Sequence, residues 1–306
     1  MAVFMIYSSK EKQALELITA AKSVGAAAVK AVSINDEAQA NTLAAAGAEV
    51  SLINNDAISL ADVAALASAL AQAASQLGAD TVLLSSDRRG KEIAGRLAAI
   101  IDAGCLTEIS VIKANGDKIE CQRNALGGAT VATQYVASAK KIIAIRPKTF
   151  DAPGAGSGSV SAMTVDVKPS AIKLIETKTR GGDSVDIEAA EVLVAVGQGL
   201  HSKDDLPAIE ALAKKLGGEV ACSKPVATDK KWLSEERIIG LSGKKCKPEL
   251  AILLGISGQV QFTVGIRDAK VIVAVNSDEN ATINGIADYV LTADLHEVVK
   301  EMNSSL

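Results

Sequence analysis

The stretch Leu250-Ala-Ile-Leu-Leu-Gly-Ile-Ser-Gly-Gln259 decides the fold of the C-terminal half of the chain. Its five apolar residues predict a buried strand, and the glycine-containing turn that follows leads into a predicted helix. Glycines at such a turn let backbone N–H groups approach an anion closely, and the start of a helix favours negative charge. A plain tight turn with Ser257 as the helix N-cap fits the same residues, so both interpretations stay open.

Strand and helix patterns alternate on both sides of this stretch. Strands are expected at 191–196, 219–222, 271–275 and 289–291, and helices at 206–216 and from 295 to 302. Several of these strands end in small or polar residues, namely Gly197-Gln-Gly199, Asn276 and Asp294. Open α/β sheets bind ligands outside the carboxyl ends of their strands, so this half is predicted to hold a nucleotide. Asn276 and Asp294 could equally be helix caps or acceptors for ribose hydroxyls.

The N-terminal half predicts a second α/β domain with a mainly parallel sheet. Strands are expected at 2–7, 27–32, 49–53 and 81–84, and helices at 12–23, 36–46, 59–77 and 90–101, with Asn35 or Asp36 and Ser59 as N-caps. Four further strands at 110–113, 119–124, 130–135 and 141–145 are expected to be antiparallel. A flexible loop is expected at 151–159 and a strand at 171–177. We place the domain boundary near residue 185, which gives domains 1–185 and 186–306.

Composition excludes several classes of function. The formal net charge is −4 and aromatic residues make up 2% of the chain, which argues against nucleic acid as a partner. No apolar run approaches the length of a membrane helix, and the apolar N-terminus is too short for a signal peptide, so we expect a cytoplasmic protein without membrane insertion. The cysteines are widely scattered and are expected to be reduced thiols. No metal site is expected, because neither the cysteines nor the two histidines have metal-ligand spacing.

Three segments together resemble the FAD-binding signature of electron-transfer flavoprotein alpha subunits. They are Lys247-Pro-Glu-Leu-Ala-Ile-Leu-Leu-Gly-Ile-Ser-Gly-Gln-Val-Gln261, Asp268-Ala-Lys-Val-Ile-Val-Ala-Val-Asn276 and Ala287-Asp-Tyr-Val-Leu-Thr-Ala-Asp-Leu295. Arg88-Arg-Gly-Lys-Glu-Ile-Ala-Gly-Arg-Leu97 and Ile145-Arg-Pro-Lys-Thr-Phe150 extend the resemblance into the N-terminal half. The run Cys222-Ser-Lys-Pro-Val226 is most similar to the subgroup named after nitrogen-fixation and carnitine-pathway proteins.

The resemblance implies a Rossmann-like C-terminal domain that binds FAD, in a heterodimer with a beta subunit. Such a complex is a redox carrier rather than an enzyme, and it passes electrons between a partner dehydrogenase and an acceptor. Whether it also bifurcates electrons would depend largely on the beta subunit. The family's cofactor contacts fall here on Ser257, Gly258, Gln259, Val260 and Gln261 at the pyrophosphate, on Asn276, Asp294 and Leu295 around the adenosine, on Ile239, Gly240, Leu241 and Ser242 along the flavin with Ser242 at N5, and on Ser223.

Three positions depart from the family pattern near the cofactor. Lys224 and Gln198 stand where the family usually has Arg, and Phe262 stands where it usually has His near the flavin O2. These departures leave open a degenerate nucleotide-binding subunit that lacks flavin redox activity. An NAD-dependent dehydrogenase is a third possibility on fold alone. The glycine pattern counts against it, because Ser202 stands where a dinucleotide fingerprint needs glycine.

Overall fold

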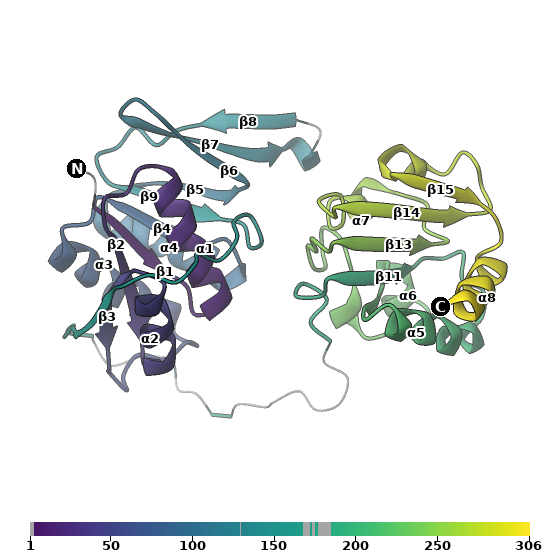
Figure 1. Ribbon diagram of the computed structural model, residues 1–306, viewed down its shortest axis with the longest axis horizontal. Coiled ribbons are helices and arrows are strands. Elements are labelled where there is room, and N and C mark those ends of the chain that lie inside the picture. The colour runs from purple at the N-terminus through teal and green to yellow at the C-terminus, as the bar shows by residue number, and fades with distance from the viewer. Residues whose placement is uncertain (1–2, 129, 168–171, 173–174, 177–184) are drawn as a thin grey trace. The chain divides into compact units, whose positions relative to one another are not determined.

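The computed structural model describes residues 3–128, 130–167, 172, 175–176 and 185–306 (Figure 1). The chain divides into two compact units, Met1–Thr177 and Lys178–Leu306. This division falls among residues outside the described ranges, and the boundary near 185 stays a prediction. The strand predicted at 171–177 also falls mostly outside the described residues.

Unit 1 is built on a seven-stranded sheet in which every neighbouring pair of strands is parallel. In spatial order its strands are β10 (Ser159–Ala162), β3 (Glu49–Ile53), β2 (Val29–Ile34), β1 (Phe4–Tyr7), β4 (Thr81–Ser85), β9 (Lys141–Ile145) and β5 (Gly104–Ile109). The loop predicted at 151–159 therefore ends in a short edge strand, because Ser159 pairs with Glu49 of β3.

Helices cover both faces of this sheet. One apolar core joins the sheet to α1 (Glu11–Ser23) and α2 (Glu37–Ala45), and a second joins it to α3 (Val63–Leu77) and α4 (Arg88–Ile101) (Figure 1). Asp36 caps α2, as one of the two expected alternatives. The prediction that Ser59 caps α3 was wrong. The helix begins four residues later, where the Asp62 carboxylate accepts hydrogen bonds from the backbone N–H groups of Ala64 and Ala65.

A separate three-stranded antiparallel sheet contains β6 (Val111–Asn115), β7 (Lys118–Ala125) and β8 (Thr130–Gln134). The short helix η1 (Leu126–Gly128) joins its last two strands. The fourth strand predicted for this sheet, Lys141–Ile145, was assigned to the wrong partner. It lies in the parallel sheet between β4 and β5. Its last four residues are all buried, and a continuous buried apolar run is typical of a parallel sheet covered on both faces.

Unit 2 contains a five-stranded sheet that is also wholly parallel. In spatial order its strands are β12 (Glu219–Cys222), β11 (Val192–Val196), β13 (Leu250–Leu254), β14 (Val271–Asn276) and β15 (Tyr289–Thr292). The first strand in sequence, β11, has its successor on one side and all later strands on the other. The strand order therefore reverses between β11 and β13, which is the point where doubly wound sheets bind their ligands.

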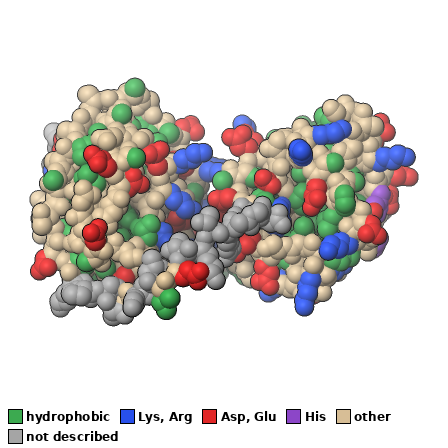
Figure 2. Space-filling model, turned by 90° about the horizontal axis from the view of Figure 1, so that it is seen from below, with side chains coloured by type: hydrophobic (Ala, Val, Ile, Leu, Met, Phe, Trp, Pro, Cys, Tyr) green, Lys and Arg blue, Asp and Glu red, His purple; other side chains and the backbone are tan. Residues whose placement is uncertain are grey.

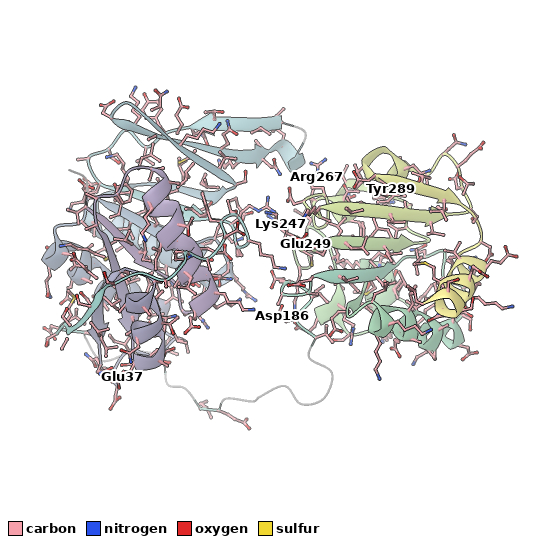
Figure 3. The ribbon with its side chains drawn as sticks, viewed as in Figure 1. Glu37, Asp186, Lys247, Glu249, Arg267 and Tyr289 are labelled. Atoms are coloured by element: carbon pink, nitrogen blue, oxygen red, sulfur yellow. The ribbon has the colours of Figure 1, made fainter. Side chains whose placement is uncertain are left out.

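Two apolar cores cover the faces of the unit 2 sheet. The helices α5 (Leu206–Lys215) and α8 (Leu295–Ser305) pack on one face (Figure 1). The opposite face is covered by residues of α7 (Val260–Thr263) and η4 (Thr282–Ile286). The remaining short helices are η2 (Lys203–Asp205), α6 (Lys224–Thr228) and η3 (Glu235–Arg237). The edge strand β15 is exposed along its length and carries Tyr289 (Figure 3).

Charged side chains are mixed on one face of the molecule, and the thiols are free. On the face shown in Figure 2, acidic and basic side chains are interspersed. All four cysteines are free, and burial raises the pKa of Cys121 to about 11 and that of Cys222 to about 12, so both are unreactive thiols. The described residues contain no cluster of three or more His, Cys, Asp or Glu placed to hold a metal ion. Within those same ranges, no helix is both long enough and apolar enough to cross a bilayer.

Candidate functional site

A cleft of about 970 Å³ opens at the carboxyl ends of the unit 2 strands. It lies where the strand order reverses, as predicted for a nucleotide site. Residues from five segments that are separate in sequence line it. Among the residues predicted to bind cofactor, the cleft brings together Gln198, Ser223, Lys224, Ile239, Leu241, Ser242, Ser257, Gln259, Gln261, Phe262 and Asn276.

Three glycines form the floor of the cleft between β11 and β13. The backbone N–H of Gly197 donates to Leu254 O at 2.9 Å, and that of Gly199 donates to Gly255 O at 2.9 Å. A Cβ atom on Gly197 would lie 2.3 Å from Gly255 O, and one on Gly199 would lie 2.7 Å from Gly255 Cα. This close approach of two backbones explains the Gly197-Gln-Gly199 sequence without a dinucleotide fingerprint.

The loop after β13 is held from the side by η4. Ser257 O accepts hydrogen bonds from Ile283 N at 3.1 Å and from Thr282 Oγ1 at 2.7 Å. Gly258 has a φ of +93°, and a Cβ atom there would lie 2.1 Å from Ile283 N. A side chain at position 258 would therefore collide with η4, so glycine is needed there for the packing of this loop. Gly258 itself does not line the cleft.

The helix predicted to start near Ser257 is shorter than expected and begins later. Gln259 is the N-cap of α7, which starts at Val260 and has four residues. The interpretation of Ser257 as N-cap is therefore wrong, and a single helical turn has too little dipole to hold an anion by itself. The exposed Ser257 lines the cleft, whereas the exposed Val260 does not.

Asn276 lines the cleft and also fixes its shape. Its Nδ2 donates to Ile256 O at 2.9 Å, and its Oδ1 accepts from Asp278 N at 3.0 Å. The amide therefore ties the end of β14 to the loop after β13. A ligand contact by Asn276 would have to use the second amide hydrogen or the second oxygen lone pair.

Asp294 and Leu295 lie outside the cleft lining. Asp294 is the N-cap of α8 and accepts a hydrogen bond from His296 N at 2.7 Å, so one of its two predicted roles is confirmed. Leu295 is buried under the loop, with Cδ2 3.0 Å from the position of a Cβ atom on Gly255. In this structure Leu295 therefore packs under the loop after β13, and Asp294 caps α8.

His296 contacts two carboxylates, that of Asp205 at the start of α5 and that of Asp294 at the start of its own helix, α8. Its Nε2 lies 3.0 Å from Asp205 Oδ2, and its Nδ1 lies 2.9 Å from Asp294 Oδ1. The hydrogen bond to Asp205, with a second to Asp294, raises the pKa of His296. The hydrogen bond from the backbone N–H of His296 lowers the pKa of Asp294. The protonated imidazole can donate to both carboxylates at once.

The segment predicted to lie along the flavin forms one wall of the cleft. Leu241 N donates to Gln261 O at 2.7 Å, and a Cβ atom on Gly240 would lie 2.4 Å from that same oxygen. Gly240 is therefore buried against the chain after β13 and does not line the cleft, whereas Ile239 and Ser242 on either side do.

Phe262 and Lys224 present different surfaces to the cleft. Phe262 is only 6% exposed and packs in the apolar core with Ile239 and Ile266. Its ring offers an apolar contact where a histidine would offer a hydrogen bond. Lys224 is exposed at the start of α6, directly after β12, with its ammonium available to a ligand.

Several lining residues were not predicted from the sequence. A polar run after β14, Asn276-Ser-Asp-Glu-Asn280, supplies Asp278 and Asn280, and its position after a buried strand could have indicated them. Thr228 is the last residue of α6 and Asp229 follows it, and neither carried a comparable signal. Gly197, Gly199, Gly255 and Ile256 also line the cleft and belong to the two turns that the sequence had indicated, whereas Pro225, Ala281 and Thr282 were not predicted.

Comparison with known proteins identifies the family of both units. Residues 10–170 match the family model of the electron transfer flavoprotein domain, and residues 186–267 match that of the electron transfer flavoprotein FAD-binding domain. The chain belongs to the electron transfer flavoprotein family. The cleft therefore lies in the unit that matches the FAD-binding domain of this family.

Curated relatives place this electron transfer flavoprotein chain with the alpha type. It is 36% identical over 245 residues to the protein FixB of Escherichia coli O157:H7, covering 78% of each chain. It is 35% identical over 228 residues to FixB of Salmonella typhimurium LT2, covering 74% of this chain and 73% of the relative. A solved structure of a thiamin diphosphate-dependent enzyme from Mycobacterium smegmatis aligns at 12% identity over 97% of this chain and 54% of that one, with a TM-score of 0.24, too low to indicate a shared fold.

These matches confirm the predicted family, the α/β fold class and the function at the level of an electron transfer flavoprotein alpha subunit. They give no support to the degenerate alternative. The matches identify domains rather than individual contacts, so all of the assigned cofactor contacts remain predictions. Asn276, Asp294 and Leu295 also lie beyond residue 267, where the FAD-binding match ends.

Proposed function

We propose that this chain binds FAD in the unit 2 cleft and, paired with a beta subunit in the cytoplasm, carries electrons between a dehydrogenase and an acceptor. The observation that carries the proposal is the cleft itself. It lies at the reversal of strand order, in the unit that matches the FAD-binding family model, and most of the residues assigned to the cofactor by resemblance line it.

The chemistry of the lining fits a flavin dinucleotide. Ile239 and Phe262 give a buried apolar surface suited to an aromatic ring, and Ser242 carries a hydroxyl that can bond a ring nitrogen. Ser257 and Gln259 also line the cleft, with neutral polar groups that suit a pyrophosphate. When bound, FAD supplies the one- and two-electron chemistry, and the side chains of the cleft bind it, orient it and set its potential.

Exposure along the flavin side supports a heterodimer. Leu241 is 67% exposed, and Lys224, Ser242 and Gln261 are also exposed in this chain. A flavin ring placed against them would remain open to water on one side. A partner subunit that covers this side would desolvate the ring and strengthen the charge interactions that tune it.

The first experiment is the visible spectrum of the purified heterodimer, with the released cofactor identified by chromatography. The proposal expects one FAD for each cleft. A colourless complex would instead indicate the degenerate subunit, and oxidation of NADH without any partner flavoenzyme would indicate a dehydrogenase.

A pair of charge-reversal variants tests whether the flavin binds in this cleft. Lys224→Glu places a negative charge at the cleft, whereas Lys214→Glu makes the same change on the exposed last turn of α5, outside the lining. We expect Lys224→Glu to lose flavin on gel filtration and Lys214→Glu to retain it. Equal flavin content in the two variants would contradict the placement of FAD in the cleft.

A further inference from the structure

The side chain of Lys230 joins two walls of the cleft. Its Nζ donates to Leu200 O at 2.5 Å and lies 3.5 Å from Gln198 O. The same ammonium lies 4.2 Å from the centre of the Trp232 ring. We call Lys230, its two carbonyl partners and the Trp232 ring the lysine clasp.

The first wall held by the clasp is the loop after β11. Gln198 and Gly199 of this loop line the cleft, and Leu200 anchors it in the apolar core, where it is fully buried. The carbonyl of Leu200 points to Lys230. The ammonium therefore holds the loop in addition to its backbone contact with Gly255.

The second wall is α6 with the residues that follow it, to which the backbone of Lys230 is firmly attached. Lys230 N donates to Pro225 O at 3.0 Å, and Trp232 N donates to Val226 O at 3.1 Å. Lys224 and Thr228, which line the cleft, belong to this helix. The side chain of Lys230 therefore links the loop after β11 to α6.

The surroundings of the clasp strengthen it. Hydrogen bonds from a charged donor are stronger than those between neutral groups, and the indole face adds a cation–π attraction. Lys230 is half-buried, so water competes with these contacts less than at an exposed lysine.

We propose that Lys230 is a positioning residue, which fixes Gln198 and Gly199 relative to Lys224 and Thr228 before a nucleotide enters the cleft. The benefit is pre-organisation: a ligand that meets a preformed cleft loses less free energy in ordering the protein. The role of the clasp in holding the loop is independent of the ligand, whereas its effect on FAD rests on the proposed function.

The test compares Lys230→Met with Lys231→Met, a neighbouring variant that removes the same charge from an exposed side chain. Hydrogen exchange of residues 197–200 is measured on the full chain without nucleotide, and the FAD release rate is measured on the heterodimer. We expect Lys230→Met to accelerate both by about tenfold, the effect of losing a charge-assisted hydrogen bond. Lys231→Met should match the wild type, and Lys230→Arg should restore most of the exchange protection.

The two readouts separate failure of this inference from failure of the proposed function. If residues 197–200 exchange equally fast in Lys230→Met and Lys231→Met, the positioning role is overturned, whatever happens to FAD. If Lys230→Met accelerates the exchange but the wild-type heterodimer takes up no FAD, the positioning role stands and the proposed function fails.

Discussion

Gly197→Ala tests whether the floor of the cleft depends on direct contact between two backbones. The added Cβ atom would lie 2.3 Å from Gly255 O, 2.7 Å from Ile256 Cγ1 and 2.8 Å from Ile256 Cα. Two of these atoms are backbone and cannot rotate away. To restore ordinary contact distances, the loops after β11 and β13 must move apart by about 1 Å.

The cost of that movement follows from the contacts it breaks. Overpacking of this kind costs about 1–3 kcal/mol, and each backbone hydrogen bond lost adds about 1 kcal/mol. The bonds at risk are Gly197 N to Leu254 O and Gly199 N to Gly255 O, both 2.9 Å long. We therefore expect Gly197→Ala to lower the free energy of unfolding of unit 2 by about 3 kcal/mol, which typically leaves a domain folded.

The assay uses the single tryptophan of the chain, Trp232, which lies in unit 2. Its fluorescence during urea unfolding reports this unit alone. Gly285→Ala is the matched control, because a Cβ atom there meets nothing within 4 Å and its backbone is not left-handed. The free energy of unfolding of Gly285→Ala should stay within about 0.5 kcal/mol of the wild-type value. The reasoning is refuted if Gly197→Ala and Gly285→Ala unfold at the same urea concentration.

Three further predictions concern the flavin, a helix cap and pH. Lys224→Met should lower the midpoint potential of bound FAD, because a positive charge beside the ring favours added electrons, and the change should correspond to a free energy of order 1–2 kcal/mol. An unchanged potential in spectroelectrochemical titration would mean that this lysine does not face the flavin. Asp62→Ala should destabilise unit 1 by about 1–2 kcal/mol in thermal unfolding, because a buried cap of two backbone N–H groups is lost; a change below about 0.5 kcal/mol would contradict this. Wild type should be more stable than His296→Gln at low pH, because the charged imidazole bonds Asp205. This difference should be full below pH about 6.5 and should decline as pH rises through the raised pKa of His296 in the folded state. Urea midpoints at several pH values that show no such decline would rule the prediction out.

Local sequence patterns were enough to predict most helices and strands. The run Leu250–Leu254 was predicted to its ends, because an apolar segment between polar residues has few alternatives in a covered parallel sheet. Lys141–Ile145 was also recognised as a strand, but its neighbours were not. Strand pairing depends on contacts between segments far apart in sequence, which the strand itself does not encode.

The candidate site was predicted where a resemblance could name positions, and missed where only folding reveals them. Ser257 and Asn276 lie in the cleft as expected. Asp229 was missed, because it reaches the cleft only through the path of the chain after α6, whereas the polar run after β14 could have indicated Asp278. The cap role of Asp294 and the packing role of Gly258 are visible only in the structure, because the same residue types also serve as ligand contacts.

The contact between the glycines after β11 and β13 also constrains when the cleft can form during folding. β12 follows β11 in sequence but pairs on its other side, so the chain must cross over before β13 arrives. Contacts between segments distant in sequence close slowly, because loop entropy opposes them until the sheet is in place. On the ribosome, the end of β11 would have β12 as a partner on one side and none on the other until β13 has emerged. The part of the cleft made by these two loops therefore takes shape only after β13 has paired with β11, late in the synthesis of unit 2.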